Sequence, residues 1–343
     1  MDNELPSISI LIPTLNAEKA LVTCLESIKS QKYPKEKIEI LVADGGSTDK
    51  TIETAKSYGA IVFGNPLKTG EAGKAVALKH AKNELVALID SDNTLPDESW
   101  LTLMVEPFCD KEILGAEPWE FTYRKEDGYI TRYCSLLGAN DPYCHFTGVY
   151  DRRCQLTDLW TGLKIEQLEK SNYLEITLEN QELPTIGANG TIWRREVLND
   201  VLEEDYFFDI DIPTRLVEKL GKFKFAKVKT GIIHIYCGKD LKSFLKKQRR
   251  RIDDLFYHGS LGQRKYKWGK VNKKKALNFI LPVTLSIPLF LQAAKGYRKS
   301  KDKAWFFHPL ACWITLIVYS TGLLRFYIKG PKKPDRTGWK QST

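Results

Sequence analysis

The sequence lacks the patterns that mark several well-known classes of protein. Its seven cysteines form no C-x-x-C pair and no spacing typical of a zinc site, so neither a zinc module nor a thioredoxin-like motif is indicated. No repeat of fixed period and no low-complexity tract occurs, which excludes a solenoid. No G-x-G-x-x-G follows the first apolar run, which disfavours a nicotinamide-dependent dehydrogenase. An ordinary folded chain of 343 residues remains, long enough for one large domain with an appendage.

The start of the chain also lacks the pattern of a secretory leader. Residues 1–15 contain no basic stretch followed by an apolar one, so we expect no cleavable signal peptide. An odd number of scattered cysteines without a leader is typical of reduced thiols in a cytosolic compartment. We therefore expect the N-terminal part of the protein to face the cytoplasm.

Positive charge is concentrated at the C-terminal end. The net charge is +9, but residues 261–343 alone carry 18 lysines and arginines against 2 aspartates, so the rest of the chain is acidic. A nucleic-acid-binding protein usually carries its basic surface on the folded domain. Here the basic residues flank apolar stretches, which indicates an anionic membrane surface as the partner and no nucleic acid.

Apolar runs typical of strands alternate with helical patterns near the N-terminus. The runs predicted as strands are Ser7–Pro13, Ile38–Ala43, Ala60–Phe63 and Leu85–Ile89. Helices are predicted between them, the first over 17–31 with Asn16 as its N-cap. Strands separated by helices of this length form a parallel sheet covered on both faces, and ligands bind outside the carboxyl ends of its strands.

The pattern becomes less regular further along the chain. Residues 115–186 are rich in aromatic and turn-forming residues, and we expect them to form the variable substrate side. Helices are predicted over 211–220, with Asp211 as the cap, and over 241–256, where apolar residues recur at helical spacing.

Two apolar segments near the C-terminus are candidate membrane helices. Residues 277–294 carry no charge but include Pro282 and Pro288, and residues 305–328 are apolar except near their ends. Both are close to the lower limit of about 20 residues for a spanning helix. Two passes are the favoured interpretation, although the basic cluster over 295–303 would then lie on the far side. A re-entrant or interfacial hairpin and a buried pair of soluble helices remain as alternatives.

Two carboxylates, Asp90 and Asp92, follow the fourth predicted strand directly. Alternate residues of an extended chain share a face, so both side chains can point at one site. Paired carboxylates suit a hard divalent cation that is completed by substrate phosphates and neutralises the charge of a departing diphosphate. A simple strand-ending turn is the alternative, and the matching polar loops after other strands favour the site.

A second polar loop, Asp44–Asp49, follows the second predicted strand. A carboxylate at this position can bind a ribose hydroxyl or a base N–H, and the helix start that follows can face phosphate. A tight turn ending in a capping Ser or Thr is the alternative interpretation.

Three segments together resemble the successive motifs of the family 2 glycosyltransferases, which have the GT-A fold. They are Ile12–Asn16, Val42–Thr51 and Leu88–Asp92. The resemblance continues in Gly70–Ala81, Gly187–Gly190, Arg194–Leu198, Asp209–Asp211 and Gln248–Ile252, the last where many members carry Q-x-x-R-W. It covers about residues 7–260 and implies an α/β fold with a mostly parallel sheet and helices on both faces.

The resemblance also implies roles for individual residues. Asp92 would hold Mn²⁺ or Mg²⁺, with Asp90 close by and His234 as a third ligand, although a lone histidine such as His234 is more often a core residue. Asp209 would be the base that deprotonates the acceptor hydroxyl in an inverting displacement, with Asp211 as the alternative base. The residues implied to bind the nucleotide sugar are Pro13, Asn16, Asp44, Lys74, Asp90, Asn189, Gln248 and Arg251.

Two departures from the family pattern bear on the mechanism. Phe208 stands where the family usually has an acid, which leaves the base open between the two aspartates that follow. Ile252 replaces the aromatic residue of Q-x-x-R-W, which weakens the case for a processive polysaccharide synthase. A lipid phosphate acceptor would already be an anionic nucleophile and would need no base. The basic run over 246–251 would then bind that phosphate, or simply lie on anionic headgroups.

These observations together predict a membrane-anchored enzyme with its catalytic domain over 1–260 and a basic membrane segment over 261–343. It would move a hexosyl-type monosaccharide from a UDP- or GDP-linked donor to a lipid phosphate or lipid-linked glycan, with the catalytic domain facing the cytoplasm. The alternatives are a sugar nucleotidyltransferase of the same fold, expected to be soluble, and an inactive GT-A domain that serves as a membrane scaffold.

Overall fold

The computed structural model describes residues 5–179, 182–201, 206–266 and 273–333. The chain forms two compact units, and their residues alternate along the sequence. The first unit, the sheet unit, contains residues up to 122 and 165–234, and the second, the helical unit, contains 123–164 and 235–333. The predicted boundary at residue 260 remains a prediction, and parts of the predicted membrane segment, 267–272 and 334–343, lie outside the described residues.

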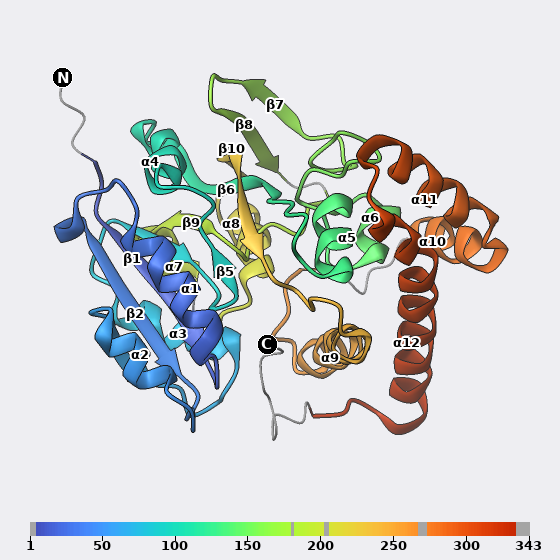
Figure 1. Cartoon of the computed structure of the whole chain (residues 1–343), viewed down its shortest axis with the longest axis horizontal. Helices are drawn as coiled ribbons and strands as arrows, with labels where there is room; N and C mark the ends of the chain where they lie inside the picture. The colour runs from blue at the N-terminus through green and yellow to red at the C-terminus, as the bar shows by residue number, and fades with distance from the viewer. Residues whose placement is uncertain (1–4, 180–181, 202–205, 267–272, 334–343) are drawn as a thin grey trace. The chain divides into compact units, whose positions relative to one another are not determined.

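The described part of the sheet unit is built on one mixed sheet of ten strands (Figure 1). Nine of them follow the order β3-β2-β1-β4-β9-β6-β10-β8-β7, and β5 pairs with β10. The half formed by β3, β2, β1 and β4 is parallel, while β9 runs antiparallel to both of its neighbours. The expected mostly parallel sheet is therefore confirmed in its N-terminal half, and the other half is mixed.

The predicted N-terminal elements are confirmed with small shifts at their ends. The strands are β1 (Ile8–Thr14), β2 (Ile38–Asp44), β3 (Ile61–Gly64) and β4 (Leu85–Leu88), and the helices are α1 (Glu18–Lys29), α2 (Thr51–Ser57) and α3 (Gly70–His80). The predicted N-cap of the first helix is wrong. Asn16 does not cap α1, because the cap position is Ala17 and the Asn16 side chain bonds elsewhere.

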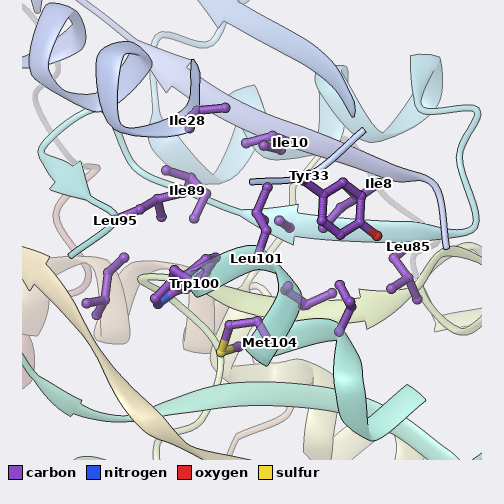
Figure 2. Close-up of a cluster of buried hydrophobic side chains, with 14 of the residues drawn as sticks. Ile8, Ile10, Ile28, Tyr33, Leu85, Ile89, Leu95, Trp100, Leu101 and Met104 are labelled. Atoms are coloured by element: carbon purple, nitrogen blue, oxygen red, sulfur yellow. The ribbon is translucent and has the colours of Figure 1, made fainter. Parts of the chain in front are cut away.

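The main core of the sheet unit lies on one face of the sheet. Ile8 and Ile10 of β1 pack there with Ile28 of α1 and with Trp100 of α4 (Trp100–Val105), as Figure 2 shows. Leu11 is also fully buried but lies outside this cluster, because alternate residues of a strand point to opposite faces. Both faces of the parallel half are therefore covered.

Residues 115–186, which were expected to be irregular, contain three strands and two helices among their described positions. The strands are β6 (Ile113–Phe121), β7 (Glu166–Glu169) and β8 (Tyr173–Glu179), and the helices are α5 (Tyr129–Leu137) and α6 (Pro142–Thr147). The sheet unit is completed by β5 (Asn93–Thr94), β9 (Thr191–Arg194), α7 (Arg195–Val201), α8 (Ile212–Leu220) and β10 (Lys222–His234). The helix predicted over 211–220 is confirmed as α8, but the Asp211 side chain makes no cap hydrogen bond.

The helical unit adds four longer helices to α5 and α6. They are α9 (Leu241–Ser260), α10 (Lys273–Leu285), α11 (Ile287–Ser300) and α12 (His308–Lys329). Its core packs Tyr133 and Phe244 against Trp305 and Phe307. The apolar segment expected as one helix over 277–294 is two helices, because the chain bends by 90° at Ser286.

One stretch of the described residues, Lys303–Lys329, is long and apolar enough to cross a membrane. The bent pair α10 and α11 would add a second crossing only if the two helices together formed one broken span.

Candidate active site

The loops after β1 and β2 are joined by the carboxylate of Asp44. Its Oδ1 accepts hydrogen bonds from the amides of Gly46 (2.9 Å) and Ser47 (2.7 Å). Its Oδ2 accepts from the hydroxyls of Thr14 (2.9 Å) and Ser47 (2.5 Å). A carboxylate has about four acceptor positions. Asp44 thus uses its acceptor capacity on its own loop and on the end of β1, while α2 begins after Lys50 without a capping Ser or Thr; nucleoside binding by Asp44 remains a prediction.

Asn16 connects the same two loops from the other side. It has a positive φ of 49°, its amide donates to Ser47 Oγ, and its Oδ1 accepts from the amide of Thr48 (2.8 Å). Pro13, at the end of β1, lies so close to α3 that a Cβ on Gly73 would come within 2.8 Å of it. These contacts fix the carboxyl ends of β1 and β2 relative to the start of α3.

A buried lysine connects two of the predicted acids. Lys74 Nζ lies 3.1 Å from Asp90 Oδ1 and 2.9 Å from Asp209 Oδ2. Burial alone would lower the pKa of Lys74, but the carboxylates of Asp209 and Asp90 outweigh burial and raise it. Burial raises the pKa of Asp90, and the Lys74 ammonium offsets only part of that shift. Lys74 is therefore a fixed cation between two carboxylates.

The loop after β4 is organised by Asn93, which the sequence analysis did not single out. Asn93 Oδ1 accepts from the amide of Asp90 (3.0 Å), and its Nδ2 donates to Asn189 Oδ1 (3.0 Å). Asn93 is fully buried and also pairs with His234 through β5 and β10. The tight turn D-S-D-N was the only sequence signal that could have pointed to it.

Asp92 and His234 form a possible cation-binding pair. His234 Nε2 lies 3.7 Å from Asp92 Oδ2. Within the described ranges, no group of three or more His, Cys, Asp or Glu side chains is arranged to hold a metal. Mg²⁺ is commonly bound by one or two carboxylates and completed by substrate phosphates. The Asp92–His234 pair fits a cation of that kind, with a bound diphosphate supplying further ligands.

Of the two candidate bases, Asp209 is the one joined to this cluster. It accepts from Lys74 at Oδ2 and from the amide of Ile210 at Oδ1. Asp211 is almost completely buried at the start of α8, with 1% of its surface exposed. Since a base must reach a substrate hydroxyl, the difference in exposure favours Asp209.

The segment that follows residue 186 is hydrogen-bonded to a residue of a buried ion pair. Glu117 and Lys227 are both fully buried and joined through Glu117 Oε2. Glu117 Oε1 accepts from the amide of Gly187 (3.3 Å) and the hydroxyl of Thr191 (3.1 Å). A Cβ on Gly187 would lie 2.5 Å from the backbone of Asp209. The ion pair therefore fixes the loop that packs against Asp209.

The last two predicted site residues, Gln248 and Arg251, belong to the helical unit. Arg251 Nη1 donates to Gln248 Oε1 (2.6 Å) and lies 3.5 Å from Asp141 Oδ2. Gln248 Nε2 donates to the carbonyl of Asn140 (3.0 Å). Their side chains thus hold the turn before α6, and their contact with a nucleotide remains a prediction.

The arrangement of the sheet and of the loops at its strand ends defines a GT-A fold. A mannosyltransferase from Pyrobaculum calidifontis, solved with GDP-mannose and Mn²⁺, has a similar structure, with a TM-score of 0.53 and 15% sequence identity. The similarity covers 94% of this chain and 88% of that one.

The sequence comparisons identify the family. The description "Glycosyl transferase family 2" matches residues 9–202, more than half of the chain, and the protein belongs to that family. Glycosyltransferase AglE of Haloferax volcanii is 29% identical over 144 residues, which is 40% of this chain and 47% of that protein.

Other relatives match shorter segments. A poly(ribitol-phosphate) β-N-acetylglucosaminyltransferase, TarS, of Staphylococcus aureus is 35% identical over 97 residues, which is 26% of this chain and 17% of that protein. A dolichyl N-acetyl-α-D-glucosaminyl phosphate 3-β-D-2,3-diacetamido-2,3-dideoxy-β-D-glucuronosyltransferase of Methanococcus voltae is 57% identical over 49 residues, 14% of this chain and 15% of that protein. The chain therefore spans less than half the length of each of these relatives.

Proposed function

We propose that this protein is a glycosyltransferase that moves a monosaccharide from a nucleotide sugar to a membrane-associated acceptor. The observation that carries the proposal is the grouping of Asp90, Asp92 and Asp209 around Lys74 and His234 at the strand ends of a family 2 fold. Charged groups gathered at the carboxyl ends of parallel strands are where such folds bind ligands.

The donor binds with its diphosphate near Asp92 and His234. These two side chains would hold a divalent cation, which would supply positive charge to the departing nucleoside diphosphate. Lys74 keeps Asp90 and Asp209 in position through its two ion pairs. Asp44 acts by shaping the loop on which the nucleoside lies, because its own carboxylate is occupied by loop donors.

Asp209 removes the proton from an acceptor hydroxyl, and the oxygen then attacks the anomeric carbon on the face opposite the leaving group. Each oxygen of Asp209 accepts one protein hydrogen bond and retains a second acceptor position for that hydroxyl. The attack inverts the anomeric configuration. A lipid phosphate acceptor would need no base, and Asp209 would then serve to orient the reacting groups.

The nature of the acceptor rests on two supports. The name of the Methanococcus voltae relative includes a dolichyl phosphate-linked sugar, which favours a lipid-linked acceptor here. The apolar helices of the helical unit would keep the active site near such an acceptor. We propose that the catalytic part faces the cytoplasm, where nucleotide sugars are made.

A donor screen tests the proposal. The protein, purified in detergent with Mn²⁺ or Mg²⁺, is incubated with UDP- and GDP-linked sugars, and nucleotide release is measured for the parent chain and for Asp92→Ala. We expect release from one donor, reduced at least about 100-fold in Asp92→Ala because charge stabilisation of the leaving group is lost. Glu53→Gln changes an exposed carboxylate of α2 and should leave the rate unchanged.

The outcome that contradicts the proposal is specific. If no donor releases nucleotide even with membrane lipid extract present, while nucleotide binding is intact, the protein is a scaffold with a GT-A fold. A product that retains the anomeric configuration would overturn the assignment of Asp209 as the base of an inverting reaction.

A further inference from the structure

More than half of the exposed large apolar side chains of the described residues lie on α10, α11 and α12. Leu285 and Ile287, on either side of the 90° bend, are 58% and 70% exposed, and Phe290 and Leu291 of α11 are 62% and 65% exposed. Leu324 of α12 is 61% exposed. Exposed apolar side chains gathered on helices that contact one another mark a protein or membrane contact.

Exposed basic side chains accompany this apolar surface. Lys295 and Arg298 lie on α11, Lys303 lies between α11 and α12, and Lys329 ends α12. Basic residues next to an apolar surface are attracted by the negative potential of anionic lipids. An apolar surface flanked by basic residues alone fits an anionic lipid surface. A contact with a second protein would be expected to carry charges of both signs around its apolar centre.

The opposite face of α12 packs against the same unit, and this packing includes polar contacts near the start, the middle and the end of the helix. His308 Nδ1 lies 2.7 Å from Tyr133 Oη near the start, Tyr319 donates to Asp141 in the middle, and Arg325 pairs with Asp253 near the end. Asp141 also caps the start of α6 and lies 3.5 Å from Arg251 of α9, and Asp253 is itself a residue of α9. If α12 crossed a bilayer, these ionised groups and the basic helix α9 beside it would be drawn into hydrocarbon, which is costly.

The basic cluster between the two apolar segments is tied to the rest of the unit. Lys299 Nζ donates to the carbonyl of Gln155 (2.8 Å) and pairs with Asp158, and Trp305 Nε1 donates to Gln155 Oε1 (3.0 Å). Gln155 and Asp158 lie in the segment that leads along the chain into β7 of the catalytic sheet. In a two-pass arrangement these contacts would have to be made across the bilayer, whereas a first apolar segment that returned to the side it entered from would leave them intact.

We propose that the helical unit docks into one leaflet of an anionic membrane through the bend between α10 and α11 and the exposed face of α12, without crossing it. The two-pass interpretation favoured by the sequence does not account for the contacts of Lys299 or for the covered face of α12. This proposal deepens the proposed membrane-associated transfer by giving its attachment, but the binding test below requires no transferase activity.

Vesicle flotation tests the partner. The full chain is mixed with phosphatidylcholine vesicles, or with vesicles in which about a third of the lipid is phosphatidylglycerol, at low and high salt. We expect binding to the anionic vesicles that weakens with salt. The double variant Ile287→Glu/Phe290→Glu should bind at least about 10-fold more weakly, because two exposed apolar anchors are lost. Leu220→Glu, an exposed leucine of α8 that is 50% exposed, is the matched control and should bind as the parent does.

Labelling of introduced cysteines tests the topology. Lys303→Cys and Lys332→Cys are reconstituted separately into sealed anionic vesicles and treated with a membrane-impermeant maleimide, with the exposed native Cys109 as a reference for the catalytic side. One-leaflet docking requires both introduced cysteines to be labelled to the same extent as Cys109. Protection of Cys at 303 alone would establish two passes, and protection at 332 alone would establish a single pass by α12.

The remaining outcomes also decide between explanations. A chain that binds no vesicle and forms a dimer, which Ile287→Glu/Phe290→Glu separates, would overturn the proposal in favour of a second copy of the chain as the partner. If the full chain binds anionic vesicles but releases nucleotide from no donor, the proposed function is overturned, and the proposal that the helical unit docks on a membrane is unaffected.

Discussion

A single ammonium group stands between two carboxylates in the candidate site. Lys74 is 4% exposed, so its charge is compensated by Asp90 and Asp209 and by very little water. Removing one partner of a buried ion pair lowers the free energy of unfolding by more than the intact pair contributes to it, because the remaining charges stay buried without compensation. The residue therefore affects both stability and the geometry of the proposed base.

Replacing this lysine should have two separable effects. Lys74→Met should lower the free energy of unfolding by about 3 kcal/mol, because two carboxylates lose their buried cation. The rate of nucleotide release should fall by more than the loss of folded protein alone would explain. Urea unfolding and the donor assay measure the two effects, with Lys79→Met, exposed on the same helix, as the control. Equal stability of the two variants would show that Lys74 does not balance the carboxylates.

A second residue-scale prediction concerns the loop against Asp209. Gly187→Ala places a methyl group where the Asp209 backbone lies 2.5 Å away, so either the loop or the base must move. A displacement of about 1 Å near a reacting group can cost about 100-fold in rate. We expect that loss in turnover with a smaller change in KM for the donor. Gly70→Ala, whose added Cβ meets no atom within 4 Å, should behave as the parent does; similar losses in both variants would contradict the prediction.

At the scale of elements, the turn before α12 depends on one carboxylate. Asp302 accepts from Arg132 Nε (2.8 Å), from the Tyr123 hydroxyl (2.5 Å) and from the amide of Ala304 (2.7 Å). Burial opposes its ionisation, yet these hydrogen bonds together hold the pKa of Asp302 below its ordinary value. Asp302 therefore joins the segment before α5 to the start of α12.

The sign of the resulting pH dependence follows from that lowered pKa. The stabilisation by Asp302 is present above the unfolded value of about 3.9 and is lost as pH falls through the lower folded value. Asp302→Asn should lower the free energy of unfolding by about 1–2 kcal/mol at pH 7, and the difference from the parent should vanish in acid. Urea unfolding at several pH values measures this. Glu126→Gln, an exposed acid in the same region, should show no such pH-dependent difference.

At the scale of the whole molecule, the helical unit is assembled from two distant stretches of chain. Tyr133 and Ile130 of α5 are buried against Trp305, Phe307 and other residues that follow position 300. A catalytic domain ending at residue 260, as the sequence predicts, would therefore lack Ala304, Trp305, Phe307 and Ala311 of this core. The family description matches residues 9–202, and the packing of the helical unit depends on residues well beyond that range.

A truncated chain tests this consequence. Residues 1–260 should aggregate or unfold at a lower denaturant concentration than the full chain, because the aromatic core of the helical unit is exposed. Size-exclusion chromatography and urea unfolding in the same detergent measure it. If the truncated chain unfolds at the same midpoint as the full chain, the core of the helical unit contributes nothing to stability.

The features that could be predicted from sequence are those encoded locally. The parallel half of the sheet and its loops follow from apolar runs that end in Asp44 or in Asp90–Asp92, and both are confirmed in position. Features that depend on distant pairing could not be predicted. Glu117 and Lys227 have no sequence signal until β6 and β10 lie side by side, and the antiparallel β9 joins strands that are remote in sequence. The bend at Ser286 was suggested only by its flanking prolines.

The interleaved composition of the helical unit also orders events during synthesis. Residues 123–164 leave the ribosome long before Trp305 and Phe307, their packing partners, have been made. At translation rates of about 5–20 residues per second, the delay is roughly ten to thirty seconds. Throughout that interval the aromatic side chains of α5 have no partner from the C-terminal helices, so we expect a nascent chain of this protein to need chaperones until its last helix emerges.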